Sequence, residues 1–290
     1  GDDAAPGSLD HPLRSVSRAA ARLSARGGGS LALRGGLYRE AVDLSVLKGD
    51  RPGAFSIHRY ATGRPAITAP DLGTGWAACD ARLAGRYGFD PAGLHLARLP
   101  RNRIAHGAPL ALNLHEAGRW CSLATLRADL SNPSAAADPD AFFEAEPILA
   151  GDLIAGLRDP RLSRLNARQL AGARVLVHHA PNMVSAVGIA EFDPDRGTIR
   201  LADGRLRVQR QGDRPVLRYA LENLAGRLAP GTWAVREAAD EVLVFFHPRD
   251  PSRLDDAVEA SLRGHSVDLG GASHGTLFRL DMIRGAGGEG

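Results

Sequence analysis

The sequence predicts a mainly β protein in which short strands coil into a solenoid, with a helix before it and a β-rich module inserted in it. Three observations predict this fold class. Similar strands recur 24 residues apart: Leu31 and Phe55 open one pair, and Ala41 and Pro65 open the next. The middle of the chain has a different texture, and the solenoid texture returns at Val258. A repeat of this length is typical of a solenoid, whose units bury their apolar faces against their neighbours.

A helix is expected at residues 11–26, directly before the first strand. The residues at helical spacing are Leu13, Val16, Ala20 and Leu23. Ser15 is a suitable N-cap, and the glycines at 27–29 end the helix. Because exposed strand edges at a solenoid end invite aggregation, a helix in this place is expected to cap that end.

The predicted domain organisation has three parts. Residues 1–72 hold the capping helix and the first rungs, residues 73–257 form the inserted β-rich module, and residues 258–290 resume the rungs. The chain stops on a Gly-rich turn, so we expect the remaining rungs to follow in a longer protein or to come from a separate chain.

Inside the module, turn residues separate apolar runs of strand length. Residues 186–192 and 198–201 are expected to form one hairpin across an Asp-Pro-Asp-Arg-Gly turn, and residues 233–235 and 241–246 a second. Residues 216–228 are expected to be helical.

Composition excludes several classes of protein. Lys and Arg number 36 against 33 Asp and Glu, for a formal charge of +3, and Lys48 is the only lysine. The arginines are scattered among acidic residues, so we expect solvated surface rather than a nucleic-acid-binding face. No run of 18 apolar residues occurs, so no membrane span is expected. The two cysteines, Cys79 and Cys121, could pair or stay as buried thiols, and neither lies in a Cys-x-x-Cys zinc motif.

Five stretches of the chain resemble the right-handed parallel β-helix proteins that act on polysaccharides. They are residues 11–20, the Gly-Gly-Leu-Tyr-Arg-Glu of 35–40, residues 63–67, the Tyr-x-Leu-Glu-Asn to Pro-Gly-x-Trp stretch of 219–235, and residues 267–276. The resemblance implies the start of a right-handed parallel β-helix with an N-terminal capping helix and an inserted β-rich module. It also implies a secreted or periplasmic protein that works on sugar chains, with its chemistry on one long face and in later rungs.

The reactions that the family implies are glycoside hydrolysis and uronate elimination. Hydrolysis needs two carboxyl groups about 5–5.5 Å apart for retention or roughly 6.5–9.5 Å for inversion. Neighbouring rungs of a solenoid are about 4.8 Å apart, so carboxylates on adjacent rungs can meet either spacing. The rung carboxylates are Glu40, Asp43, Glu259, Asp268, Asp281 and Glu289. Each could equally be a solvated rung residue.

The catalytic candidates are Glu40, Glu222 and His274. Glu40 belongs to the first rung, and Glu222 to the stretch 219–235 that carries part of the resemblance. The structural alternative for Glu222 is that it connects the helix expected at 216–228 to a turn. Because Lys48 lies in a loop, His58 with Arg59 and His274 remain as candidates for the base of a lyase, and each histidine alone could be structural.

The substrate-binding candidates are Tyr38, Arg39, His58, His178 and Asn182. Tyr38 could stack on a sugar ring and Arg39 could hold a carboxylate, or both could serve packing and solvation. His178 and the neighbouring His179 face opposite sides of a strand, so they do not suit one metal ion, and the turn that holds Asn182 follows them.

We therefore predict a glycoside hydrolase that acts on a polysaccharide or oligosaccharide through paired carboxylates. Two alternatives stay open: a polysaccharide lyase on the same scaffold, and a non-catalytic sugar-binding or adhesion fragment. No cofactor or metal is expected, apart from Ca²⁺ if the protein is a lyase. No Walker motif occurs in the sequence.

Overall fold

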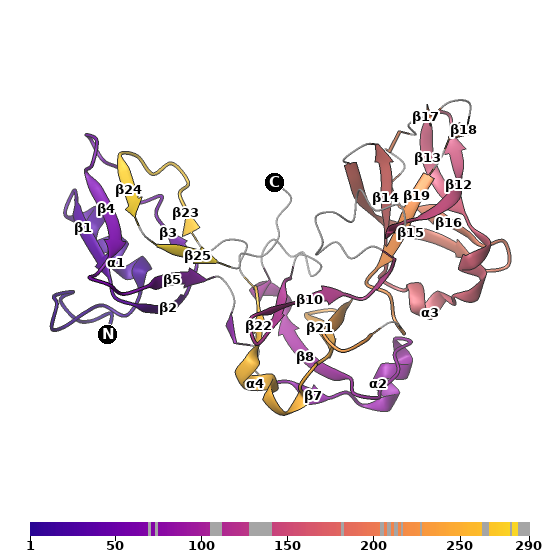
Figure 1. The fold of residues 1–290 in the computed structure, drawn as a ribbon, viewed down its shortest axis with the longest axis horizontal. Coiled ribbons are helices and arrows are strands. Elements are labelled where there is room, and N and C mark those ends of the chain that lie inside the picture. The colour runs from indigo at the N-terminus through magenta and orange to yellow at the C-terminus, as the bar shows by residue number, and fades with distance from the viewer. Residues whose placement is uncertain are drawn as a thin grey trace. The chain divides into compact units, whose positions relative to one another are not determined.

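The computed structural model describes residues 1–68, 71–72, 75–104, 112–127, 141–180, 183–203, 206–207, 210–211, 214–215, 217–226, 228–262, 267–278 and 280–283. Contacts divide the chain into two compact units. Unit 1 comprises Gly1–Leu72, Asn102–Asn113 and Glu259–Gly290, and unit 2 comprises Gly73–Arg101 and Leu114–Val258. Strands dominate both units (Figure 1).

Unit 1 is built on three parallel sheets with the strand orders β1-β4-β24, β2-β5-β25 and β3-β23. The strands are β1 (Gly29–Leu33), β2 (Gly36–Arg39), β3 (Val42–Asp43), β4 (Phe55–Arg59), β5 (Pro65–Thr68), β23 (Val267–Asp268), β24 (Gly275–Phe278) and β25 (Asp281–Ile283). The yellow strands from the end of the chain lie beside the indigo strands from its beginning (Figure 1). The predicted pairing of strands from both ends is thus confirmed.

The repeat is less regular than the sequence predicted. Gly29 pairs with Phe55, 26 residues on, and Gly36 pairs with Pro65, 29 residues on, so the expected interval of 24 was wrong. The corner between β1 and β2 spans residues 34–35, whereas the corner between β4 and β5 spans residues 60–64. Three extra corner residues account for the difference between the two intervals, since corners can vary in length while paired strands cannot.

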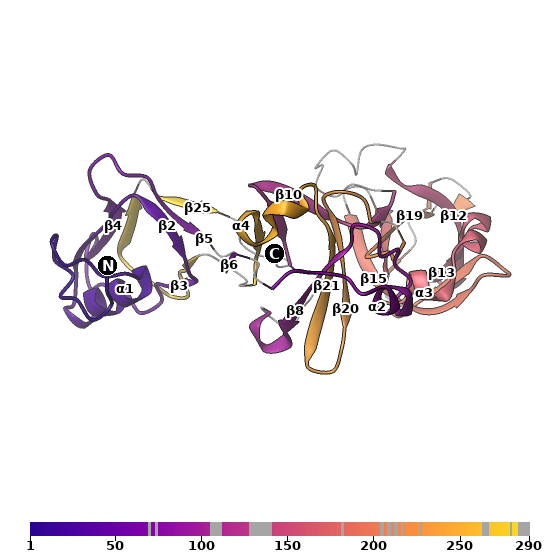
Figure 2. The same ribbon diagram turned by 90° about the horizontal axis from the view of Figure 1, so that it is seen from below.

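Helix α1 (Val16–Ala25) packs on this unit, which confirms a helix before the first strand, but it begins at Val16 and not at residue 11 as expected. The Ser15 side chain accepts a hydrogen bond from the Arg18 N–H, which is the N-cap arrangement. The apolar side of the helix enters the core, which consists of Val16, Ala20, Leu23, Leu33, Val42, Leu44, Leu47, Phe55, Ile57 and Ile67. Figure 2 shows α1 next to β3, and the helix contacts β1 as well.

One strand of unit 1 departs from the prediction. The solenoid texture was expected to resume at Val258, but β22 (Val258–Ala260) pairs antiparallel with β6 (Asp71–Leu72) through Glu259 and Ala260. In the described part of unit 1, parallel pairing resumes at β23. In chain order, β4 and β5 are therefore followed on the parallel sheets by β23, which lies against β3.

Unit 2 contains two bodies of strands. The first is a curled sheet of the order β9-β10-β20-β21-β8-β7. Its elements are β7 (Ala77–Ala78), β8 (His95–Pro100), β9 (Leu114–Glu116), β10 (Arg119–Leu123), β20 (Thr232–Glu237) and β21 (Glu241–His247), with α2 (Ala81–Arg86), the 3₁₀ turns η1 (Arg101–Arg103) and η6 (Pro251–Arg253), and α4 (Leu254–Ala257) around it. Antiparallel β20 and β21 confirm the second predicted hairpin.

The second body is a closed six-stranded barrel of the order β19-β12-β13-β16-β15-β14, closed by pairing between β14 and β19, which lie side by side in Figure 1. Its elements are β12 (Phe143–Ala150), β13 (Leu153–Arg158), β14 (Arg174–Ala180), β15 (Met183–Asp193), β16 (Thr198–Leu201) and β19 (Leu217–Glu222), with η5 (Pro160–Arg164), α3 (Ala167–Leu170), β11 (Thr125–Leu126), β17 (Arg210–Gln211) and β18 (Arg214–Pro215) attached. Antiparallel β15 and β16 confirm the first predicted hairpin.

The helix expected at 216–228 was wrong, because its first half is β19. Leu217, Tyr219 and Leu221 alternate along this strand and are fully buried in the barrel core. Leu217 and Leu221 are also four residues apart, which is compatible with a helix. Pairing with β12 on one side and β14 on the other makes this segment a strand.

The stretch from Tyr219 to Val235 joins the barrel to the curled sheet. Asn223 follows β19 with a left-handed φ of 59°. Its Nδ2 donates to the carbonyls of Gly172 (2.6 Å) and Val235 (3.2 Å), and its Oδ1 accepts from the Val235 N–H at 2.8 Å. Buried Trp233 donates its indole N–H to the Cys121 carbonyl at 2.8 Å. This stretch, one of the five that resemble β-helix proteins, therefore connects the barrel and the curled sheet through buried hydrogen bonds; we call it the brace of unit 2.

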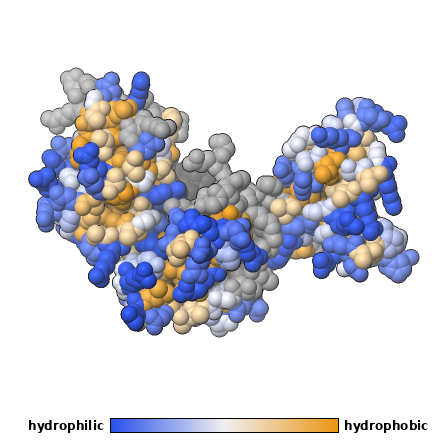
Figure 3. Space-filling model, turned by 180° about the vertical axis from the view of Figure 1, so that it is seen from behind, coloured by the Kyte–Doolittle hydropathy of each residue, from blue (hydrophilic) through white to orange (hydrophobic). Residues whose placement is uncertain are grey.

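Both cysteines are buried free thiols, and burial raises the pKa of each. The question that the sequence left open is thus answered: Cys79 and Cys121 do not pair. In the part of the chain that the structure describes, no helix is long and apolar enough to cross a membrane. On the face in Figure 3, hydrophilic residues are interspersed with small hydrophobic areas.

Candidate functional site

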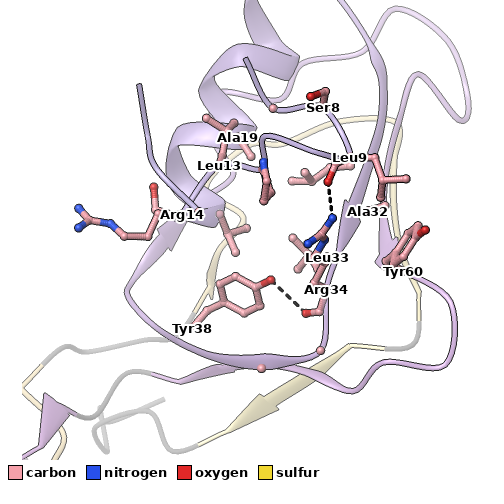
Figure 4. A pocket seen from close by; sticks show the side chains of 18 of the residues that line it. Ser8, Leu9, Leu13, Arg14, Ala19, Ala32, Leu33, Arg34, Tyr38 and Tyr60 are labelled. Carbon is pink, nitrogen blue, oxygen red and sulfur yellow. Dashed lines mark hydrogen bonds between the residues drawn. The ribbon is translucent and has the colours of Figure 1, made fainter. Parts of the chain in front are cut away.

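A cavity of about 620 Å³ lies in unit 1 beside the N-terminal arm, which we define as residues 1–15. The arm, the first turn of α1 and the corner between β1 and β2 form its walls. Leu13, Arg34 and Tyr38 lie inside it, whereas the Arg14 side chain points away (Figure 4). Its volume is in the range of about 300–1,000 Å³ that is usual for small-molecule sites.

Two hydrogen bonds shape the wall of this cavity. The Tyr38 hydroxyl donates to the Arg34 carbonyl at 3.0 Å, and the Arg34 guanidinium donates to the Leu9 carbonyl of the arm (Figure 4). Burial is the main reason why the pKa of Tyr38 is raised, so its phenol stays neutral at physiological pH. Tyr38 thus presents a neutral aromatic ring to the cavity.

The neighbours of Tyr38 are engaged elsewhere. Arg39 forms an ion pair with Glu259 at 2.7 Å. Glu40 caps the helix: its Oε1 accepts from the Val16 N–H at 2.7 Å, and its Oε2 accepts from the Ser17 N–H (3.0 Å) and hydroxyl (2.6 Å). A carboxylate in this position satisfies N–H groups that a helix leaves unpaired and complements the helix dipole. The structure therefore brings neither side chain to the cavity.

Replacing Glu40 by Gln is expected to lower the free energy of unfolding by about 1–2 kcal/mol, because an amide removes the charge and one acceptor from the α1 N-terminus. Urea denaturation of the two proteins measures this loss. Asp50→Asn, at an exposed turn of the same unit, is the control and should change stability little. Full stability of Glu40→Gln together with a loss of enzymatic activity would contradict the capping role and support the catalytic prediction for Glu40.

The two predicted histidines of unit 1 lie in different settings. The His58 Nδ1 is 3.2 Å from the Ser30 hydroxyl, which also accepts from the Ser56 hydroxyl at 2.9 Å, so a polar ladder crosses adjacent strands. His274 has a left-handed φ of 56° and lines a second cavity of about 200 Å³ beside apolar core residues such as Leu277. Neither is placed by the structure in the cavity of Tyr38.

The predicted residues of unit 2 lie on the barrel. Glu222 is 4% exposed and its carboxylate accepts from the Arg174 Nε at 2.5 Å. Half-buried His178 stacks on Phe142 with ring centres 5.4 Å apart. Burial is the main cause that lowers the pKa of His178, and the Arg218 charge adds to it, so the imidazole is neutral at pH 7. Asn182 lies outside the described residues.

Glu222 gives the protein a pH-dependent contribution to stability. Burial raises the pKa of this carboxyl group although Arg174 opposes the shift. The stabilisation linked to a raised pKa is fully present below the unfolded-state value of about 4.3 and is lost as the pH rises through the folded-state value. The unfolding free energy of the wild type minus that of Glu222→Gln is therefore expected to be larger at pH 4 than at pH 7. Urea denaturation at both pH values measures it, with Glu146→Gln at an exposed site of β12 as the control, and an unchanged difference would contradict the assignment.

The structure brings together one pair of carboxylates on adjacent strands. Asp43 on β3 and Asp268 on β23 are directly in register, and neither is buried. Each accepts at Oδ1 from the backbone N–H two residues on, Ser45 for Asp43 and Gly270 for Asp268, both at 2.8 Å. Adjacent strands are about 4.8 Å apart, so the two aspartates lie side by side on neighbouring strands.

Sequence reasoning included both aspartates among the rung carboxylates but did not select them as catalytic. The available signal is the tripeptide Val-Asp-Leu, which occurs at 42–44 and again at 267–269. The two tripeptides lie 225 positions apart in the chain and pair as adjacent strands. In each, the Asp side chain accepts a hydrogen bond from the backbone N–H two residues on. A Cβ at Gly270 would lie 3.0 Å from the Asp268 Oδ1 and 3.3 Å from the Ser45 Cβ, so a residue without a side chain suits this stacking.

Within the described ranges, no group of three or more His, Cys, Asp or Glu residues is placed to hold a metal ion.

Comparison with known proteins gives a likeness of fold. No family model matches the chain, and no curated protein matches it. Among solved structures, a chain described as a glycoside hydrolase is similar with a TM-score of 0.65 and 18% identity, over 97% of this chain and 49% of that one. XylC, solved in complex with xylose, is similar with a TM-score of 0.50 and 10% identity, over 97% of this chain and 34% of that one. This chain thus spans half or less of the length of either.

Proposed function

We propose that the protein is a carbohydrate-active enzyme of the glycoside hydrolase type. The observation that carries the proposal is the likeness of fold, across 97% of this chain, to a chain described as a glycoside hydrolase. The complex of XylC with xylose supports a saccharide as the ligand. In this proposal the three parallel sheets of unit 1 are the first coils of a right-handed parallel β-helix, residues 73–257 form an inserted module, and the protein works outside the cell or in the periplasm.

The chemistry is assigned to Asp43 and Asp268. One carboxyl group would protonate the leaving oxygen and the other would attack or stabilise the sugar carbon, as glycoside hydrolysis requires of its two acids. Their register on adjacent parallel strands supports this assignment. Alternation along residues 42–44 supports it too, because Val42 and Leu44 are buried and Asp43 is exposed.

An assay for new reducing ends tests the proposal. The full-length gene product would be incubated with xylo-oligosaccharides, with other neutral polysaccharides and with uronate polymers. Reducing ends without ultraviolet absorbance of a new C=C bond would support hydrolysis. Absorbance on uronate polymers would replace the proposal with a lyase, and binding without any product would replace it with a non-catalytic sugar-binding protein.

A further inference from the structure

We propose that the cavity beside the N-terminal arm is a non-catalytic binding site for an acidic sugar, a pyranose ring that carries a carboxylate. The inference rests on the proposed function for its expectation of a saccharide. It goes beyond that function, because the cavity contains neither Asp43 nor Asp268.

Exposed apolar residues gather at this cavity. The exposed large apolar residues of the described part of unit 1 are Leu9, Leu37, Val46, Tyr60 and Leu269. Three of them line the cavity: Leu9 is 55% exposed, Leu37 46% and Tyr60 42%. Scattered exposed apolar residues need no explanation, but residues clustered at a concave site are typical of a binding surface. Tyr60 and the half-buried Tyr38 offer the aromatic faces on which the C–H groups of a sugar ring can pack.

The charge of the cavity favours an acidic ligand. None of its described lining residues is Asp or Glu. Arg14 pairs with Asp3 at 3.8 Å and points away, whereas the Arg34 guanidinium lies inside (Figure 4). A guanidinium has five N–H donors, so the bond from Arg34 to the Leu9 carbonyl leaves donors for a carboxylate. A carboxylate can take two parallel bonds from this group, which a neutral hydroxymethyl group cannot match.

The same lining excludes hydrolysis in this place. Glycoside hydrolysis requires a pair of carboxyl groups beside the scissile bond, and the described walls offer none. The site would therefore hold one acidic residue of a chain or an oligosaccharide, and it would not turn it over. Such a site would increase the local concentration of acidic polysaccharide at the protein.

Binding of simple glycosides tests the inference. The probes are methyl glucuronide and methyl galacturonide, with methyl glucoside and methyl galactoside as their neutral counterparts, and calorimetric titration or ligand-observed NMR measures affinity. Wild type should prefer the acids. Arg34→Met should lower their affinity by at least about tenfold, as expected for a hydrogen bond to a charged group, with little effect on the neutral sugars. Arg18→Met, at an exposed residue of α1 outside the cavity, is the matched control.

Two more variants separate recognition from damage to the arm. Arg34→Lys keeps the charge and should restore part of the preference for acids, whereas Tyr60→Ala should weaken acidic and neutral sugars alike. The inference fails if wild type binds neither acid, binds neutral sugars equally well, or keeps its preference in Arg34→Met. It also fails if Arg34→Lys restores nothing. The reducing-end assay is independent, so loss of hydrolysis and loss of this site give different results.

Discussion

Replacing either Asp43 or Asp268 by Asn is expected to lower the rate of glycoside hydrolysis by at least about a hundredfold, because general acid–base catalysis contributes about 10²–10⁴-fold. The substitution is selective. Each aspartate uses Oδ1 to accept a backbone N–H at 2.8 Å, and an Asn side chain keeps a carbonyl oxygen that accepts the same bond. The turn should survive while the ionisable group is lost.

Reducing-end kinetics on the best substrate from the panel, together with urea denaturation, measure both consequences. Asp43→Asn and Asp268→Asn should each retain nearly the stability of the wild type. The double variant should be scarcely slower than either single variant, because groups that act as a unit are not additive. Asp50→Asn serves as the control at an exposed turn of the same unit. Full activity in either single variant would remove the pair from the mechanism and would leave the chemistry to other residues.

Asn223→Ala is expected to lower the free energy of unfolding by about 2–5 kcal/mol, from backbone strain and one buried hydrogen bond. Left-handed backbone geometry costs a non-glycine residue about 1–2 kcal/mol, and Ala lacks the polar side chain that offsets this cost. The substitution also leaves the buried Val235 N–H without its side-chain partner, at about 1–3 kcal/mol for a buried group. The bond to the carbonyl of exposed Gly172 is lost as well, but water can replace it. These costs fall where the barrel meets the curled sheet.

Urea denaturation monitored through buried Trp233 measures the loss. Asn223→Gly tolerates the left-handed geometry and should recover the strain but not the hydrogen bonds, so it should lie between wild type and Asn223→Ala. Asn166→Ala removes the exposed cap of α3 and should cost only about 1 kcal/mol. A loss for Asn223→Ala no larger than that of Asn166→Ala would show that the brace contributes little.

Local signals account for the elements that sequence reasoning placed correctly. Ser15 caps α1 and the buried face of the helix has helical spacing. The turn Asp-Pro-Asp-Arg-Gly joins β15 to β16, and both partners are rich in strand-forming residues. Such features act over a few residues, so neither the barrel nor the rungs were needed to recognise them. The likeness between the two ends of the chain was readable for the same reason, since each rung repeats a short pattern.

The partners of side chains could not be predicted in the same way. Glu40 reaches α1 because helix and rung pack together, and Glu222 meets Arg174 because β14 and β19 pair to close the barrel. Each contact joins residues more than 20 positions apart. The pattern of residues 217–222 is compatible with a helix and with a strand. Pairing with β12 and β14 makes it a strand, so the helix predicted there was wrong.

The sequence by itself determined that this protein is mainly β, that a capped helix precedes its first strands and that strands from its two ends are alike. Only the tertiary structure decided which acids meet. Asp43 and Asp268 come into register, and Tyr38 and Arg34 line one cavity, because parallel pairing and the fold of the arm set their positions. The physical reason is that patterning encodes burial along the chain, whereas contacts between distant residues depend on how corners, strand registers and packed faces add together in space.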